Sequence, residues 1–406
     1  MNKNLTLKEV LQIYHDNKQV KNNNLYYLLA KRALELGENF YAYDIVENIS
    51  EDNLSIKIKK IHIMALSLAR SGAINHAVQL VNEIPDIKNS ELIGLKSRIL
   101  KDLAIKSKNP AEKKSLYKMA GNLSLNIFNI EKKYYNGINA ASCLFCAGEK
   151  EFALNLVKNE ILPLCLREKY EDDLWLLATL GEAHLLIEDY NNSLAYYKKA
   201  AQIVIEKGQM GSFSSTLKQI FMLSNYLDKS MAQMIIKNLN LPSVAVFIGC
   251  TQEEFLSDLH IIQNEELIRQ NIALLIKKYN IQMSFSSLFC PVDVIFIEEM
   301  LKAGGGCHIL PPIPLKTAVK KYVKPYVAGN FEERFARILK NNKTFFFDAE
   351  CDEIQDKNDE VIYEFVNKFI YGLAFNKANS VYFPFVSIKK NNFNTDKIFT
   401  TEYING

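Results

Sequence analysis

The sequence predicts two structural parts, an α-helical repeat array over residues 1–240 and a doubly wound α/β domain over residues 241–406. Small residues recur in the first part at intervals near those of helical-hairpin repeats. In the second part, short apolar runs rich in β-branched residues alternate with amphipathic segments. The pattern changes after the polar segment Lys237–Pro242, which we take as the boundary.

The composition is that of a globular protein and excludes some partners. A chain of 406 residues is too long for one ordinary core, and its hydrophobic share is 48% with 23% charged residues. Its 49 basic and 46 acidic residues leave a formal charge of +3, too small to attract nucleic acid or anionic lipid. We therefore expect neither nucleic acid nor membrane as a partner.

The N-terminus and the cysteines indicate a cytoplasmic protein. The N-terminal segment lacks an apolar h-region, and no apolar run approaches the roughly 18 residues of a membrane span. The seven cysteines lie in apolar segments, as expected of reduced thiols used for packing. Cys143 and Cys146 form a Cys-x-x-Cys pair without a second pair or paired histidines nearby, so burial is predicted over a metal or redox site.

The clearest helical repeat runs from Leu177 to Ala200. Its residues follow the tetratricopeptide (TPR) spacing, with His184 and Ser193 where tyrosine and alanine are usual. The small residue of the second helix recurs at separations of 35, 76 and 40 residues, at Ala42, Ala77, Ala153 and Ser193. The doubled interval predicts a further unit over residues 99–125, with Asn109-Pro110 as turn and helix start.

Hairpins of this size must stack to bury their apolar faces, which predicts a TPR-like α-solenoid with a concave groove. Grooves of this kind usually bind peptides or other domains. We therefore expect a protein partner in the groove.

Two elements of the helical part resemble a known family. They are Lys96–Asp102 (KSRILKD) and Tyr134–Ala141 (YYNGINAA). In this order they resemble the TRAFs-binding domain, a helical-repeat region found beside the kinase domain of apoptosis signal-regulating kinases and in many bacterial proteins. The resemblance covers about residues 26–207, and no kinase signature accompanies it. Packing explains the second element, because Gly137, Ala140 and Ala141 permit close helix approach while Asn139 can satisfy a backbone group at a bend.

The second part alternates between predicted strands and helices. Strands are expected at residues 243–249, 281–285, 307–310, 344–347 and 380–386, and helices at residues 264–279, 291–302, 331–340 and 356–375. Five strands separated by helices imply a mostly parallel, Rossmann-like sheet with helices on both faces.

Ligands of such sheets bind beyond the carboxyl ends of the strands. The loops at residues 249–251, 286–291 and 311–312 fall there. Ser286 and Ser287, with free backbone amides before a helix starting near Pro291, could hold an anion. The same serines are also ordinary helix N-caps, and this second interpretation stays open.

The second part also resembles a family. Residues 290–298 (CPVDVIFIE), followed by Met300, Leu301, Gly304 and Leu310-Pro311, look like SLOG-type Rossmann-like domains, and residues 331–335 (FEERF) match a helix of those relatives. The resemblance implies a nucleotide or nucleotide-derived ligand, with Gly249 and Asp293 near its site. The relatives usually carry glycine before the aspartate and histidine after the glycine, whereas this chain has Val292 and Cys250. Bulkier side chains there leave less room for phosphate, so a degenerate domain without ligand is an alternative.

Catalytic motifs are weak. Gly304–Gly306 lacks the Lys-Ser/Thr of a phosphate loop and precedes a strand, so it predicts a helix C-cap and turn. Asp293 and Glu298 could serve as acid and base, but five residues apart they fall on different helix faces. Arg334 is a candidate anion ligand, although Glu332 and Glu333 beside it equally suit an ion-pair former.

The preferred hypothesis is a non-catalytic signalling or regulatory protein, in which the helical repeats bind a protein partner and the α/β domain senses a nucleotide-like ligand. The alternatives are a nucleotide-processing hydrolase or transferase using Asp293 or Glu298, and an interaction scaffold with a degenerate α/β domain. No metal site, catalytic residue or further cofactor is assigned. The candidate ligand-binding residues are Gly249, Cys250, Thr251, Ser286, Ser287, Asp293, Glu298 and Arg334.

Overall fold

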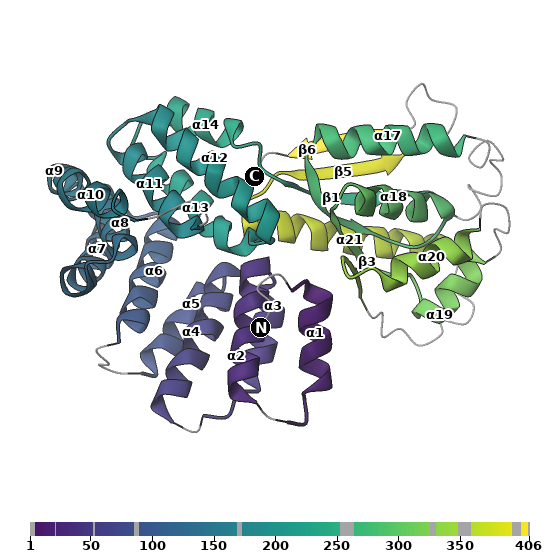
Figure 1. The fold of residues 1–406 in the computed structure, drawn as a ribbon, viewed down its shortest axis with the longest axis horizontal. Coiled ribbons are helices and arrows are strands. Elements are labelled where there is room, and N and C mark those ends of the chain that lie inside the picture. The colour runs from purple at the N-terminus through teal and green to yellow at the C-terminus, as the bar shows by residue number, and fades with distance from the viewer. Residues whose placement is uncertain are drawn as a thin grey trace. The chain divides into compact units, whose positions relative to one another are not determined.

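The computed structural model divides into two compact units, one of residues 10–240 with residue 5, and one of residues 241–406 with residues 6–9. It describes residues 5–20, 22–51, 53–84, 89–168, 173–251, 264–324, 330–347, 359–391 and 399–404. The first unit is helical and the second is built on a sheet (Figure 1). The predicted fold class, helical repeats followed by a mostly parallel sheet, is confirmed.

Most helices before residue 240 pack in consecutive pairs. In chain order the helices are α1 (Leu7–Asp16), α2 (Asn23–Leu36), α3 (Asn39–Glu47), α4 (Leu54–Arg70), α5 (Ile74–Asn82), α6 (Ser90–Lys106), α7 (Pro110–Glu131), α8 (Tyr134–Cys146), α9 (Lys150–Leu156), the π-helical turn η1 (Val157–Ile161), α10 (Leu162–Cys165), α11 (Leu174–Leu186), α12 (Tyr190–Lys207), α13 (Met210–Leu223) and α14 (Lys229–Asn238). The pairs are α2 with α3, α4 with α5, α6 with α7, α8 with α9, α11 with α12 and α13 with α14.

The predicted small residues are buried within the second helix of their helix pairs. All four are buried on a second helix of a pair, at Ala42 of α3, Ala77 of α5, Ala153 of α9 and Ser193 of α12. The further unit expected over residues 99–125 is formed by α6 and α7. Asn109 caps α7, because its side chain accepts a hydrogen bond from the amide of Ala111 at 2.9 Å, and Pro110 occupies the first turn.

Close helix packing explains part of the second family-like element. A Cβ atom on Gly137 would lie 2.8 Å from the ring of Phe128, so α8 can approach α7 this closely only with glycine there. Ala140, Cys143 and Cys146 are buried on the same helix. The packing role predicted for these residues is confirmed.

The second unit contains a six-stranded sheet. Its strands are β1 (Ser243–Ile248), β2 (Ile281–Ser286), β3 (Gly306–Ile309), β4 (Thr344–Phe346), β5 (Phe385–Lys390) and β6 (Phe399–Ile404), and its helices are α17 (Glu265–Lys278), α18 (Pro291–Lys302), α19 (Leu315–Ala318) with the π-helical turn η2 (Val319–Val323), α20 (Phe331–Lys340) and α21 (Asp359–Val381). The spatial order is β4-β3-β2-β1-β5-β6, and all neighbours are parallel except β5 and β6. Strand order therefore reverses between β1 and β5, where a ligand crevice is expected in such folds.

Helices cover both faces of this sheet. Ala245 and Phe247 of β1 belong to the core that includes buried residues of α17, α18 and α20. On the other face, the ring of Phe385 contacts Tyr371 and Phe375 of α21, with ring centroids 5.1 and 5.5 Å apart. Side chains alternate between the faces of a strand, so β1, which is covered on both faces, is apolar from Val244 to Ile248.

The last predicted strand is misplaced. Residues 380 and 381 belong to α21, and the fifth strand begins at Phe385. The helix continues because Ala374, Ala378 and Val381 recur at helical spacing and are buried. It ends at Tyr382, which has a φ of 59°. The antiparallel strand β6 was not predicted, and residues 356–358 of the predicted helix lie outside the described residues.

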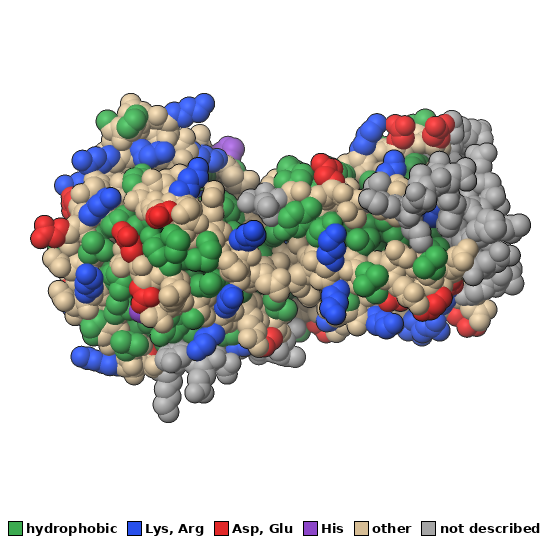
Figure 2. All heavy atoms as spheres, turned by 90° about the horizontal axis from the view of Figure 1, so that it is seen from above, with side chains coloured by type: hydrophobic (Ala, Val, Ile, Leu, Met, Phe, Trp, Pro, Cys, Tyr) green, Lys and Arg blue, Asp and Glu red, His purple; other side chains and the backbone are tan. Residues whose placement is uncertain are grey.

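The surface agrees with the small net charge. On the face drawn in Figure 2, Lys and Arg side chains stand apart from one another over the helical unit and form no continuous basic area. In the described part of the chain, no helix has both the length and the apolar character of a membrane span.

Candidate functional site

The predicted ligand-binding residues of the second unit divide into two groups. Gly249, Cys250, Thr251, Ser286 and Ser287 follow or end strands β1 and β2, and Asp293 of α18 reaches the same tips. Glu298 of α18 and Arg334 of α20 belong to a separate ion-pair network. The structure therefore does not bring Asp293 and Glu298 together.

Asp293 holds the loop before α18. Its carboxyl group is buried, and Oδ2 accepts hydrogen bonds from the amides of Phe289 at 2.7 Å and Cys290 at 3.2 Å. Burial raises the pKa of Asp293 to about 6, although these hydrogen bonds act in the opposite direction. A Cβ atom on Gly249 would lie 2.3 Å from Asp293 Oδ1, so glycine is required where β1 ends.

The tips of β1 and β2 are covered by thiols and aromatic rings. The Sγ atoms of Cys250 and Cys290 are 3.3 Å apart, and both cysteines are buried. The ring of Phe289 packs edge-on against Tyr322 and Tyr363, and the Tyr363 hydroxyl donates to the carbonyl of Gly249 at 3.0 Å.

The serines of the same loop are also buried. The Ser286 hydroxyl has no hydrogen-bond partner within the described residues. The Ser287 hydroxyl lies beside the Asp293 carboxyl and lowers its pKa. Thr251 is half-buried. The residues at the tips of β1 and β2 therefore form a candidate polar site. The side chains of Phe289 and Tyr363 cover it.

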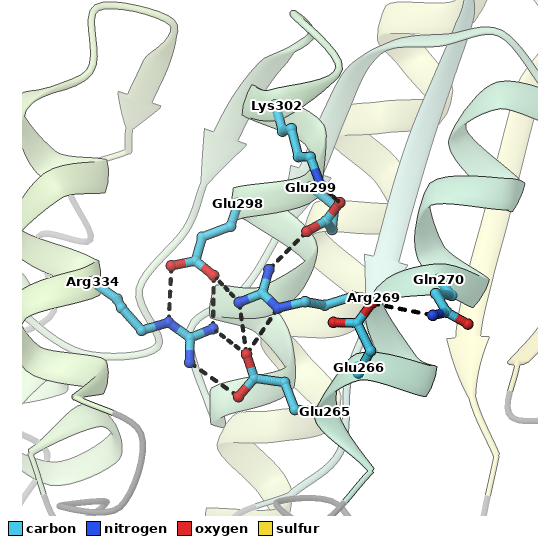
Figure 3. A network of polar contacts seen from close by, with 8 residues as sticks. All are labelled: Glu265, Glu266, Arg269, Gln270, Glu298, Glu299, Lys302 and Arg334. Atoms are coloured by element: carbon cyan, nitrogen blue, oxygen red, sulfur yellow. Dashed lines mark hydrogen bonds and ion pairs between the residues drawn. The ribbon is translucent and has the colours of Figure 1, made fainter.

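Glu298 and Arg334 bind each other, as Figure 3 shows. Arg334 donates from Nε to Oε1 of Glu298 at 2.9 Å and from Nη2 to Oε2 at 2.7 Å, and its Nη1 donates to Glu265 at 3.2 Å. Burial raises the pKa of Glu298, but the arginines outweigh it, so the pKa is lower than usual. Arg334 therefore forms ion pairs with Glu298 and Glu265, which is one of the two roles considered for it.

Arg269 of α17 completes the network. It pairs with Glu298, and with Glu299 at 2.7 Å and Glu265 at 2.7 Å. The two guanidinium groups thus bind three carboxylates from α17 and α18, with α20 supplying Arg334 (Figure 3). Arg269 was not among the predicted residues, although Glu265 and Arg269 have the i, i+4 spacing of a helical ion pair.

A cavity with a volume of about 60 Å³ opens in the helical unit. That is several times the roughly 10–15 Å³ that one water molecule needs, so the cavity admits a group the size of phosphate. Helices α6, α7, α8, α11 and α13 line it, and its polar and aromatic residues include Ser97, Arg98, Lys101, Asp102, Ser124, Tyr135, Asn136, Asn139, Trp175, Thr179, Glu182, Ser215, Lys218 and Gln219. Both family-like elements of the helical part therefore meet in one cavity, and this cavity was not predicted from the sequence.

A chain of polar contacts orders the cavity wall. Lys101 Nζ donates to Asn139 Oδ1 at 3.2 Å and to Gln219 Oε1 at 2.8 Å. Gln219 in turn donates to Glu182 at 2.7 Å, and burial raises the pKa of the Glu182 carboxyl. Asn139 lies within α8 and not at a bend, since its amide donates to the carbonyl of Tyr135 at 2.8 Å. Its side chain is therefore part of the wall.

Positive charge exceeds negative charge here. Lys218 pairs with the buried Asp102 at 2.7 Å. Arg98 of the lining and Arg70 behind it both donate to the Ser215 hydroxyl, at 3.1 and 3.4 Å. Burial, and then the neighbouring Arg98, lower the pKa of Arg70 to about 9. The Nε atoms of both arginines are buried without a hydrogen-bond partner among the described residues.

One comparison bears directly on this cavity. Residues 39–144 match the Tetratricopeptide Repeats-Sensor family model. The TPR-sensor segment carries Arg98, Lys101 and Tyr135, whereas Trp175 and Lys218 lie beyond it. The match establishes a TPR-like helical region. The TRAFs-binding and SLOG resemblances are not tested by it and stay predictions.

Two solved structures show weaker similarity. A thermophilic TPR protein of Thermus thermophilus has 16% sequence identity and a TM-score of 0.38, over 54% of this chain and 100% of that protein. LpoA of Haemophilus influenzae has 12% identity and a TM-score of 0.24, over 84% of this chain and 68% of that protein. No curated protein matches the chain. Similarity at this level says nothing about ligand or partner.

Proposed function

We propose that this protein is a non-catalytic signalling protein that senses a small anionic ligand in the cavity of its helical unit. One observation carries the proposal. The lining contains the cations Arg98, Lys101 and Lys218 against the carboxyl groups of Asp102 and Glu182, and Arg70 adds a further cation behind Ser215.

Electrostatics supports an anion over other ligands. Two guanidinium groups that share one serine repel each other, and burial costs them solvation. A phosphate-like group between Arg98, Lys101 and Lys218 would receive charge-assisted hydrogen bonds and offset the repulsion. The family name also describes the matched segment as a sensor.

We further propose that the repeats recruit a protein partner, since TPR-like helices commonly present such surfaces. The ligand would bridge α6, α8 and α13, which belong to different hairpins. Binding would therefore stabilise one arrangement of the stacked hairpins and change the surface offered to the partner.

The tips of β1 and β2 are a second candidate site for a nucleotide-like ligand. The buried, unpartnered hydroxyl of Ser286 favours it. Phe289 and Tyr363 would have to move, which makes this site less accessible than the helical cavity.

The enzyme and scaffold alternatives have separate tests. Turnover of NAD or common nucleotides that is abolished by Asp293→Asn would favour an enzyme. A nucleotide panel that leaves the thermal stability unchanged would favour a scaffold with a degenerate α/β domain.

Calorimetric titration of the full chain with pyrophosphate tests the main proposal. We expect saturable binding, and at least a tenfold loss in Arg98→Gln, because a charge-assisted hydrogen bond contributes about 1.5–3 kcal/mol. The variant should fold with a Tm at or above that of the wild type, since it removes the repulsion with Arg70. Lys198→Gln, at an exposed position of α12, is the control and should bind normally. Unchanged binding in Arg98→Gln would contradict the proposal.

A further inference from the structure

Two aromatic rings border the cationic cavity. Tyr135 and Trp175 line it and remain 46% and 36% exposed. Their ring centroids are 5.8 Å apart, with an interplanar angle of 79°. An exposed tryptophan alone is unremarkable in a protein surface. Its position beside Arg98 and Lys101 is informative, because one ligand can contact the rings and the cations together.

The structure holds these rings in place. The Tyr134 hydroxyl donates to Asp173 Oδ2 at 3.0 Å, and Asp173 Oδ1 accepts from the amides of Trp175 at 2.8 Å and Leu176 at 3.2 Å. Asp173 thus caps α11 and ties its first turn to α8, which carries Tyr135. A preorganised pair of rings loses little conformational freedom when a ligand binds.

We propose that the cavity ligand is a nucleotide, whose phosphate lies among Arg98, Lys101 and Lys218 and whose base stacks on Trp175 beside Tyr135. This inference rests on the proposed function, that the cavity binds an anion. The cavity volume of about 60 Å³ suits the phosphate alone, so the rest of the ligand must lie at the rim, where the rings are. A flat base covers an aromatic face, and such stacking strengthens binding by about fivefold or more per base.

A sugar phosphate or inorganic phosphate would use the cations but leave the rings exposed. A phosphotyrosine peptide would share the phosphate contacts and place a smaller ring at the rim. The wide indole face of Trp175 favours the nucleotide, since a purine covers more of it than a phenol ring does.

Trp175 is the only tryptophan of the chain, so its fluorescence reports on this rim. The full chain, excited at the red edge of the indole band, is titrated with AMP, ribose 5-phosphate, pyrophosphate and a phosphotyrosine peptide. We expect saturable quenching by AMP and a Kd at least about fivefold below that of ribose 5-phosphate, the lower limit for one stacked base.

Variants at the rim separate base from phosphate binding. Tyr135→Leu and Trp175→Leu should weaken the binding of AMP several-fold and leave the Kd of ribose 5-phosphate unchanged. The Trp175→Leu variant is measured by calorimetry. Phe152→Leu is the control, because Phe152 of α9 is 48% exposed and does not line the cavity. All three positions are exposed, so the variants should keep the far-ultraviolet circular dichroism of the wild type.

The outcomes distinguish this inference from the function on which it rests. Equal Kd values for AMP and ribose 5-phosphate, or tighter binding of the phosphotyrosine peptide than of AMP, would overturn the nucleotide assignment and leave the anion site standing. Failure of all four compounds to bind would overturn both.

Discussion

Asp293 is an acidic residue in a buried environment, which disfavours its charged form. Its pKa of about 6 exceeds the ordinary value of 3.8, so the folded state binds the proton more tightly than the unfolded state does. Its stabilising contribution is therefore complete below pH 3.8 and is lost as the pH rises through 6. A change in pKa from 3.8 to about 6 alters the free energy of unfolding by at most roughly 3 kcal/mol. The carboxylate is retained although it is costly at neutral pH, because it holds the amides of Phe289 and Cys290.

Asp293→Asn should therefore gain free energy of unfolding relative to the wild type between pH 4 and pH 7, by up to roughly 3 kcal/mol in urea titrations. Asp228→Asn is the matched control. Asp228 caps α14, and hydrogen bonds led by that from Ser230 lower its pKa below 3.8, so the corresponding difference should stay nearly constant between pH 4 and pH 7 and change only at lower pH. A difference for Asp293→Asn that does not vary with pH would show that its carboxyl group is not perturbed.

At the same scale, sequence reasoning named Gly249, Asp293 and Arg334 but not their partners. The family resemblance and the position at a strand end identify such a residue in the sequence. Its burial and its partners depend on contacts made across the fold, which the sequence does not show. Arg98, Lys101 and Tyr135 were noticed only as parts of family-like elements. Their convergence depends on α6 and α8 meeting α11 and α13, which distant segments of sequence bring together.

At the scale of elements, the Glu265, Arg269, Glu298, Glu299 and Arg334 network joins α17, α18 and α20. Removing one partner of a buried ion pair typically costs about 3–5 kcal/mol. We expect Arg334→Ala to cost about 3 kcal/mol, the lower end, because Glu298 remains 20% exposed and can be hydrated. Arg337→Ala, at an exposed position of the same helix, should change stability by less than about 0.5 kcal/mol. Equal effects of the two substitutions in denaturant titrations would contradict a stabilising network.

Most elements could be predicted because their hydrophobic periods are clear. The hairpins around Ala42, Ala77, Ala153 and Ser193 and the first four strands lie close to their expected places. The segment at residues 380–386 was misread because Ser-Val-Tyr-Phe resembles a strand locally, while the buried face of Ala374 and Ala378 extends α21 across its start. Tertiary packing, and not local strand propensity, determines that residues 380 and 381 are helical.

At the scale of the whole molecule, the two units have separate hydrophobic cores. We expect calorimetry of the full chain to show unfolding that departs from a single two-state transition. Pyrophosphate at 100 times its Kd should stabilise one transition by about 2.7 kcal/mol, because the ligand binds only the helical unit. The second transition should not move. A single two-state transition, or equal shifts of both, would be inconsistent with a ligand site confined to the helical unit.

A crystal structure of the full chain grown with AMP would show whether the nucleotide binds in the helical cavity. We predict difference density for the phosphate among Arg98, Lys101 and Lys218, with density for the base against Trp175. Density for AMP beside Ser286 and Ser287 at the tips of β1 and β2, with none in the helical cavity, would show that the α/β unit, and not the helical unit, binds the nucleotide.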